Sequence, residues 1–171
     1  MTEERIELIV ENLLENYWSG SLPVNPIAIA CAFDIDVVDD DELNVKNSFC
    51  ISETKCIHVK KSLSASDKRY AIAQELGRIL LGLHDSFRDA AEPESSLEVF
   101  PEEDALARQF ARALLLPEVA LKRHGYASKE ERDAYNVPFE AMYVRLHDKH
   151  VFLAVELGVS PSLIKMGVVR R

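Results

Sequence analysis

The sequence predicts an α+β protein, in which a small antiparallel three-stranded sheet packs against a predominantly helical body. Apolar residues recur at helical spacing in residues 3–18, 64–83 and 102–116. Short β-branched and aromatic runs are confined to residues 35–61. A chain of 171 residues that is 47% hydrophobic can bury the core of one domain. Because strands and helices are segregated along the chain, the α+β class is favoured.

The first expected element is a helix over residues 3–18, which Ser19-Gly20-Ser21 ends. A second, short helix is expected from Pro26 to about Phe33, because proline is well tolerated in the first helical turn. The inward stripe of the first helix consists of apolar and aromatic residues at helical spacing: Ile6, Ile9, Val10, Leu13, Leu14 and Tyr17.

Three strands are expected next, at residues 35–39, 47–53 and 55–61. Their sequences are IDVVD, NSFCISE and KCIHVKK, and the short polar segments DDDE and SETK separate them. Short strands joined by polar turns are typical of an antiparallel meander. Cys50 and Cys56 would then lie on adjacent strands, where their thiols could approach each other.

A long helix should follow, with either Ser64 or Ser66 as its N-cap. Its predicted inward residues are Tyr70, Ala73, Leu76, Ile79, Leu80 and Leu83. The polar stretch at 84–101 is long for a structureless connection, so it is either functional or mobile. A further helix stops before Pro117, and residues 128–171 are expected to be helical with breaks near Pro138, Gly158 and Pro161.

The net charge of −9 lies entirely in the first third of the chain, since residues 1–57 contain twelve acidic and three basic residues. Such a surface is unsuited to the phosphate backbone and suits a basic partner, or it is a solvated face. No apolar run approaches the ~20 residues of a membrane span, and the acidic N-terminus differs from a signal peptide. The three cysteines have no CxxC spacing, so we expect reduced thiols and a cytoplasmic protein.

The segment Ala73-Gln74-Glu75-Leu76-Gly77-Arg78 is close to a zinc peptidase motif. In His-Glu-x-x-His, histidines four residues apart share a helix face and bind one zinc ion, while the glutamate activates a bound water. Glu75 stands at the general-base position of this frame. Gln74 and Arg78 stand where the two histidines would be.

Four segments, in order over most of residues 23–146, resemble the ImmA/IrrE-type zinc metallopeptidase family. RYAIAQELGRILL resembles its RxxxAHELGHxLL helix, with QELGR in place of HELGH. PVNPIAIACAFDIDVV, DALARQFARALLLPE and NVPFEAMYVRL resemble its opening segment, its ExxANxFAAxLLMPE helix and its later FxVSxxAMxxRL segment. The resemblance implies a single zincin-like domain over 1–171, with an N-terminal helix (1–20), a metallopeptidase-like core (23–125) and a C-terminal helical extension (126–171). It also places Asp104 at the position of the third metal ligand.

The resemblance implies that active members of this family are zinc endopeptidases that cleave helix-turn-helix repressors. This sequence departs from them at the ligands, because a glutamine amide is a poor zinc ligand and an arginine cannot deprotonate. We therefore expect no zinc cofactor and no ordinary peptidase activity. The hypothesis for the altered site is that the Arg78 guanidinium occupies the zinc position and pairs with Asp104 or Glu75.

The predicted function is that of an inactive homologue that binds a helix-turn-helix repressor or antitoxin of a mobile element or stress regulon. The groove would lie between the Gln74–Arg78 helix and the Asp104–Leu116 helix. One alternative is an active metallo-endopeptidase with an atypical site, for example one relocated to His84 and Asp104. Another is a DNA-binding regulator that uses a helix-turn-helix-like segment at 154–164, although few basic residues flank it and direct nucleic-acid binding is not expected.

Overall fold

The computed structural model describes residues 1–43, 47–84, 101–126 and 128–156. It consists of two compact units, Met1–Pro138 and Phe139–Arg171. The interior of the polar stretch at 84–101 lies outside the described residues, as does most of the helix-turn-helix-like segment at 154–164.

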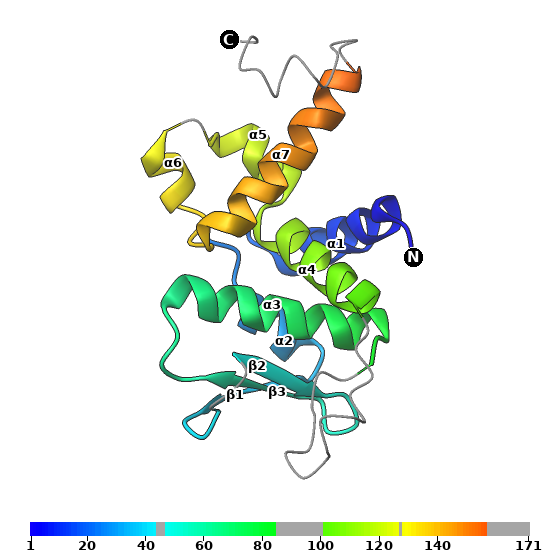
Figure 1. The fold of residues 1–171 in the computed structure, drawn as a ribbon, viewed down its shortest axis with the longest axis vertical. Helices are drawn as coiled ribbons and strands as arrows, with labels where there is room; N and C mark the ends of the chain where they lie inside the picture. The colour runs from blue at the N-terminus through cyan, green and yellow to red at the C-terminus, as the bar shows by residue number, and fades with distance from the viewer. Residues whose placement is uncertain (44–46, 85–100, 127, 157–171) are drawn as a thin grey trace. The chain divides into compact units, whose positions relative to one another are not determined.

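The first unit begins with two helices, continues with three strands and ends with four helices (Figure 1). The second unit contributes one described helix, α7 (Phe139–Glu156). The elements of the first unit are α1 (Glu3–Tyr17), α2 (Pro26–Ala32), β1 (Asp36–Asp40), β2 (Ser48–Ile51), β3 (Cys56–Lys60), α3 (Ala65–Leu81), α4 (Pro101–Leu115), α5 (Glu118–His124) and α6 (Lys129–Asp133). Among the described residues, no helix is both long and apolar enough to cross a bilayer.

Side-chain caps fix where the early helices begin, close to the predicted boundaries. The side chain of Asn25 accepts hydrogen bonds from the backbone N–H groups of Ile27 and Ala28, and Pro26 occupies the first turn of α2. Of the two serines proposed to cap α3, Ser64 does so, because its hydroxyl accepts from the Asp67 N–H at 3.2 Å. Gly82, with φ of +64°, ends α3 in the left-handed conformation that favours glycine.

The α+β class is confirmed, but the prediction that the sheet is an antiparallel meander is wrong. The strand order is β1-β3-β2, so β3 is central. β2 and β3 form the expected antiparallel hairpin, in which Phe49 lies opposite His58. β1 instead runs parallel to β3, with Val38 opposite His58. The sheet is therefore mixed.

Charge pairing gives a physical reason for the place of β1 beside β3. The acidic run at the end of β1 has hydrogen-bonding or basic partners on β3 and on the chain that follows it. Asp40 pairs with His58 at 3.2 Å, Asp41 with Lys61 at 2.9 Å and Asp39 with Lys68 at 2.6 Å. A meander would have placed β2, which carries no basic residue, next to β1.

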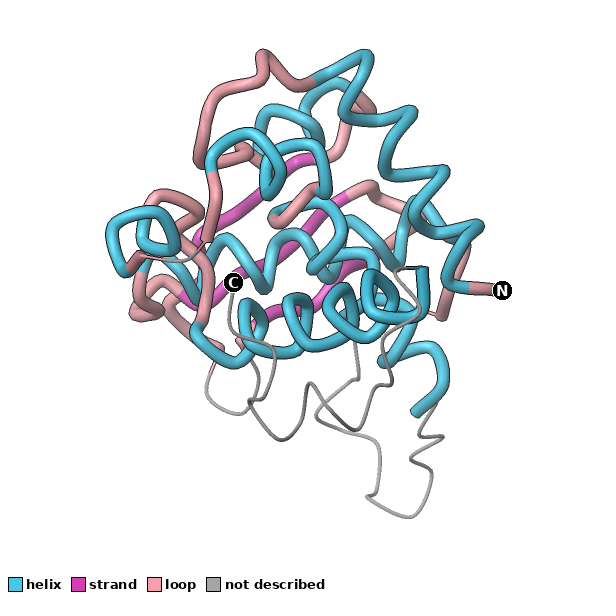
Figure 2. Tube along the Cα trace, turned by 90° about the horizontal axis from the view of Figure 1, so that it is seen from above, coloured by secondary structure: helices cyan, strands magenta, loops and turns pink. Residues whose placement is uncertain are grey.

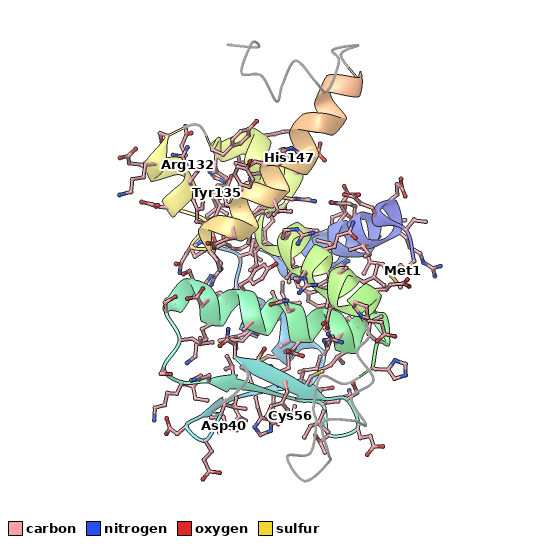
Figure 3. All side chains as sticks on the ribbon, in the orientation of Figure 1. Met1, Asp40, Cys56, Arg132, Tyr135 and His147 are labelled. Carbon is pink, nitrogen blue, oxygen red and sulfur yellow. The ribbon has the colours of Figure 1, made fainter. Side chains whose placement is uncertain are left out.

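One face of the sheet packs against the helices, which lie over the strands in Figure 2. Ile57 and Val59 of β3 are fully buried on this face, and Cys50 of β2 lies opposite Ile57. Cys56 alternates to the other face, where Figure 3 shows it together with Asp40, on the side away from α3. The thiols of Cys50 and Cys56 therefore point to opposite faces, and both cysteines are free.

α3 and α4 pack tightly at Gly77, where a Cβ atom would lie 2.8 Å from the fully buried ring of Phe110. We expect Gly77→Ala to destabilise the fold by about 1–2 kcal/mol, because overpacking a filled core outweighs the better helix propensity of alanine. Urea denaturation would measure this change. In a Phe110→Leu background the cost of Gly77→Ala should fall, and an unchanged cost would show that the ring is not the obstacle.

Candidate functional site

The helix α3 and the start of α4 bring three of the predicted site residues together. The Arg78 guanidinium forms an ion pair through Nη2 with Oδ1 of Asp104, and a second through Nε with Oε2 of Glu75 at 3.8 Å. Its Nη1 also donates a hydrogen bond to the carbonyl of His84 at 3.1 Å. The expected pairing of Arg78 with Asp104 or Glu75 is confirmed, since both pairs are present. That the guanidinium replaces a metal stays a prediction.

Burial distinguishes the members of this cluster. The side chains of Arg78 and Glu75 are 9% and 7% exposed, whereas that of Asp104 is 44% exposed. Glu75 is also held from the sheet, because the Ser48 hydroxyl of β2 donates to its Oε1 at 2.8 Å. One carboxylate oxygen of Glu75 therefore faces a hydroxyl and the other faces a cation, and little of either side chain reaches solvent.

Neither the Gln74 side chain nor the His84 ring takes part in the ion pairs of Arg78, which His84 contacts through its backbone carbonyl. The side chain of Gln74 is half-buried. Among the described residues it forms no hydrogen bond with Arg78. The His84 ring lies 2.9 Å from Oε1 of Glu103, and its backbone N–H donates to Oε2 of the same carboxylate. A relocated metal site would need the His84 ring beside Asp104. The structure instead pairs this ring with Glu103.

Glu103 and its partners show how charge is balanced beside the cluster. Partial burial acts to raise the pKa of Glu103, but the hydrogen bonds from His84 and the positive charges of His84 and Arg78 outweigh it, so the pKa is lowered. The carboxylate form of Glu103 is thus favoured next to Asp104. Two carboxylates at the start of α4 also interact well with the N-terminal end of the helix dipole.

A zinc ion, which the sequence resemblance implies for active relatives, does not fit these residues. Zinc is normally held by imidazole, thiolate or carboxylate ligands, and of the three expected ligand positions only Asp104 offers one. A permanently charged guanidinium contacts that carboxylate and would repel a cation. Over the described ranges, no three His, Cys, Asp or Glu side chains converge as a metal site.

Sequence reasoning missed Ser48 and Glu103. Ser48 comes from a strand 27 residues before Glu75, and no local pattern marks a serine that will face a helix. Glu103 precedes Asp104 directly, so the sequence offers two adjacent carboxylates as partners for His84. The choice between adjacent carboxylates depends on the exact rotation of α4, which helical spacing does not determine.

The fold is that of a zincin-like α+β domain. Residues 31–166 match the family model described as the IrrE N-terminal-like domain, and the chain belongs to this family. Among solved structures, the chain is similar to a Mycobacterium tuberculosis transcriptional regulator, with a TM-score of 0.58 and 20% sequence identity. The similarity covers 81% of this chain and 45% of the regulator, so this chain spans less than half of that protein. No curated protein matches the sequence.

Proposed function

We propose that this protein is a non-catalytic member of its family that regulates a helix-turn-helix repressor or antitoxin by binding it. One observation carries the proposal: the buried Arg78 guanidinium contacts both Glu75 and Asp104. A cation at this place joins α3 and α4 as a metal would, but it supplies no exchangeable water. The altered motif is then a structural connection and no longer a catalytic centre.

The surroundings of Glu75 support the same conclusion. A general base must reach the proton that it removes, directly or through one water molecule. Glu75 is 7% exposed, accepts from Ser48 and lies beside Arg78. In this arrangement the carboxylate stabilises a buried cation, which is a sufficient reason for its presence without catalysis.

The binding surface that we propose is the exposed side of the cluster, at the start of α4. α3 and α4 are in direct contact where Phe110 packs onto Gly77, so the groove expected between them is closed there. Asp104 at the start of α4 is 44% exposed, so its carboxylate is the part of the cluster that a partner can reach. A basic side chain of the partner would pair with it.

We infer the kind of partner from the family and from the charge of this chain. The family resemblance implies that ImmA/IrrE-type proteins act on helix-turn-helix repressors. The solved structure of similar fold is named a transcriptional regulator. DNA-binding proteins carry basic surfaces, which the acidic first third of this chain would attract. We propose a role in controlling a mobile element or stress regulon in the cytoplasm, through such a protein.

The direct test uses the purified protein and the repressor or antitoxin encoded nearest to its gene. We expect stable binding of that protein, no cleavage with or without added zinc, and metal content well below one zinc ion per chain. Chelation should leave the binding unchanged. Zinc near one ion per chain together with chelator-sensitive cleavage would instead establish the active endopeptidase, and a lack of binding would remove the proposed partner.

A further inference from the structure

A groove of about 570 Å³ lies between α1 with the residues that follow it and a second wall formed by the end of α4, Pro117 and α5. It shares no residue with the Arg78 cluster. From its lining we infer that it binds a basic amphipathic helical segment of a partner protein, with the apolar stripe of that helix against the floor and its Lys or Arg side chains along α1.

The floor of the groove is apolar. Val10 and Leu14 of α1 line it and are nearly fully buried in the chain's own core, and Ala113 and Pro117 face them from the other side. At the rim Val119 is 50% exposed, although it is a large hydrophobic residue next to a concave surface. An apolar floor with an exposed apolar rim is typical of grooves that accept the apolar face of a helix.

The charge of the groove selects the partner. Glu7, Glu11 and Glu15 lie one helical turn apart on α1, so their carboxylates extend for about 12 Å along one wall. Glu11 and Glu15 are exposed, and neither forms an ion pair with another described residue. Arg123 is the one basic residue in the lining, against four glutamates. The wall therefore attracts cations.

The same spacing argues for a helix as the occupant. Lys or Arg residues at i and i+4 of a partner helix repeat at the interval of Glu11 and Glu15, so that each base can face one acid. Apolar residues beside that stripe would then meet Val10 and Leu14 on the floor. Glu118, on the opposite wall, already pairs with Lys122 at 2.6 Å, so the attraction is concentrated on the α1 side.

Trp18 provides a reporter inside the groove, because it lines the groove and is the single tryptophan of the chain. Its indole N–H donates to the carbonyl of Ser21 at 2.7 Å, which holds the ring in place. The probe is a synthetic helical peptide of about 14 residues that combines a Leu stripe with a Lys stripe at i and i+4. We expect saturable binding with a blue shift of Trp18 emission, and no binding of the same peptide with Glu in place of Lys.

The matched variants reverse two charges each. Glu11→Lys with Glu15→Lys should weaken binding of the Lys peptide by roughly tenfold or more. The control, Glu42→Lys with Glu53→Lys, changes the net charge equally at exposed positions outside the groove and should bind as the wild type does. Equal weakening in both variants would mean non-specific charge attraction, and binding without a change in Trp18 emission would place the peptide elsewhere. Either result, or no binding of the Lys peptide, would overturn the inference.

Discussion

Replacing Gln74 and Arg78 together with histidine is expected to give a protein that binds about one zinc ion per chain. The two imidazoles would be four residues apart on one face of α3, the spacing at which both reach one metal. The third ligand is already close, because the side chain at position 78 contacts Asp104 of α4 in the present structure. Zinc content by mass spectrometry and a zinc-dependent rise in melting temperature would measure the change.

The single variants serve as controls for this result. Gln74→His alone leaves the guanidinium in place, and Arg78→His alone supplies two ligands of three, so each should bind zinc far more weakly than the double variant. Adding Asp104→Ala to the double variant should lower zinc affinity again. If the double variant folds but takes up no zinc, the positions of Gln74, Arg78 and Asp104 do not form a metal-site geometry, and the interpretation of the altered motif fails.

The helices of this fold were predictable because the residues that determine a helix lie close together in the sequence. The apolar stripe of α1 predicted its bounds to within a residue at its C-terminal end, and the start of α3 was predicted at Ser64 or Ser66, of which Ser64 is the cap. The contact between Arg78 and Glu75 follows from their spacing on one helix. The contact between Arg78 and Asp104 followed from the family resemblance, which places the two helices side by side.

Pairing between distant segments was not predictable in the same way. The strand segments were identified, but β1 pairs with a strand about 20 positions later, and the ion pairs of Asp39, Asp40 and Asp41 form only once this strand order exists. Ser48 could not be assigned to the site for the same reason, because its bond to Glu75 requires the position of β2 under α3. Periodicity describes which face of an element is buried and does not describe which element covers it.

Removing the cation of the cluster is expected to destabilise the fold strongly. We expect Arg78→Met to lower the free energy of unfolding by about 2–4 kcal/mol. The methionine retains an unbranched apolar stem, but the ion pairs with Glu75 and Asp104 and the hydrogen bond to the His84 carbonyl are lost. Glu75 would remain buried without its cation, which is the costly part. Urea denaturation at neutral pH would measure the loss.

Two further variants separate this explanation from a simple packing defect. Asp104→Asn should cost only about 1 kcal/mol, because Asp104 is 44% exposed and solvent screens its charge. Arg78→Met with Glu75→Met should recover much of the stability lost in Arg78→Met, since replacing both members of a buried pair leaves no isolated charge. If the costs of the two substitutions simply add, Arg78 and Glu75 are not coupled. The guanidinium would then not be the cation that holds α3 to α4, and it would not stand in for a metal ion.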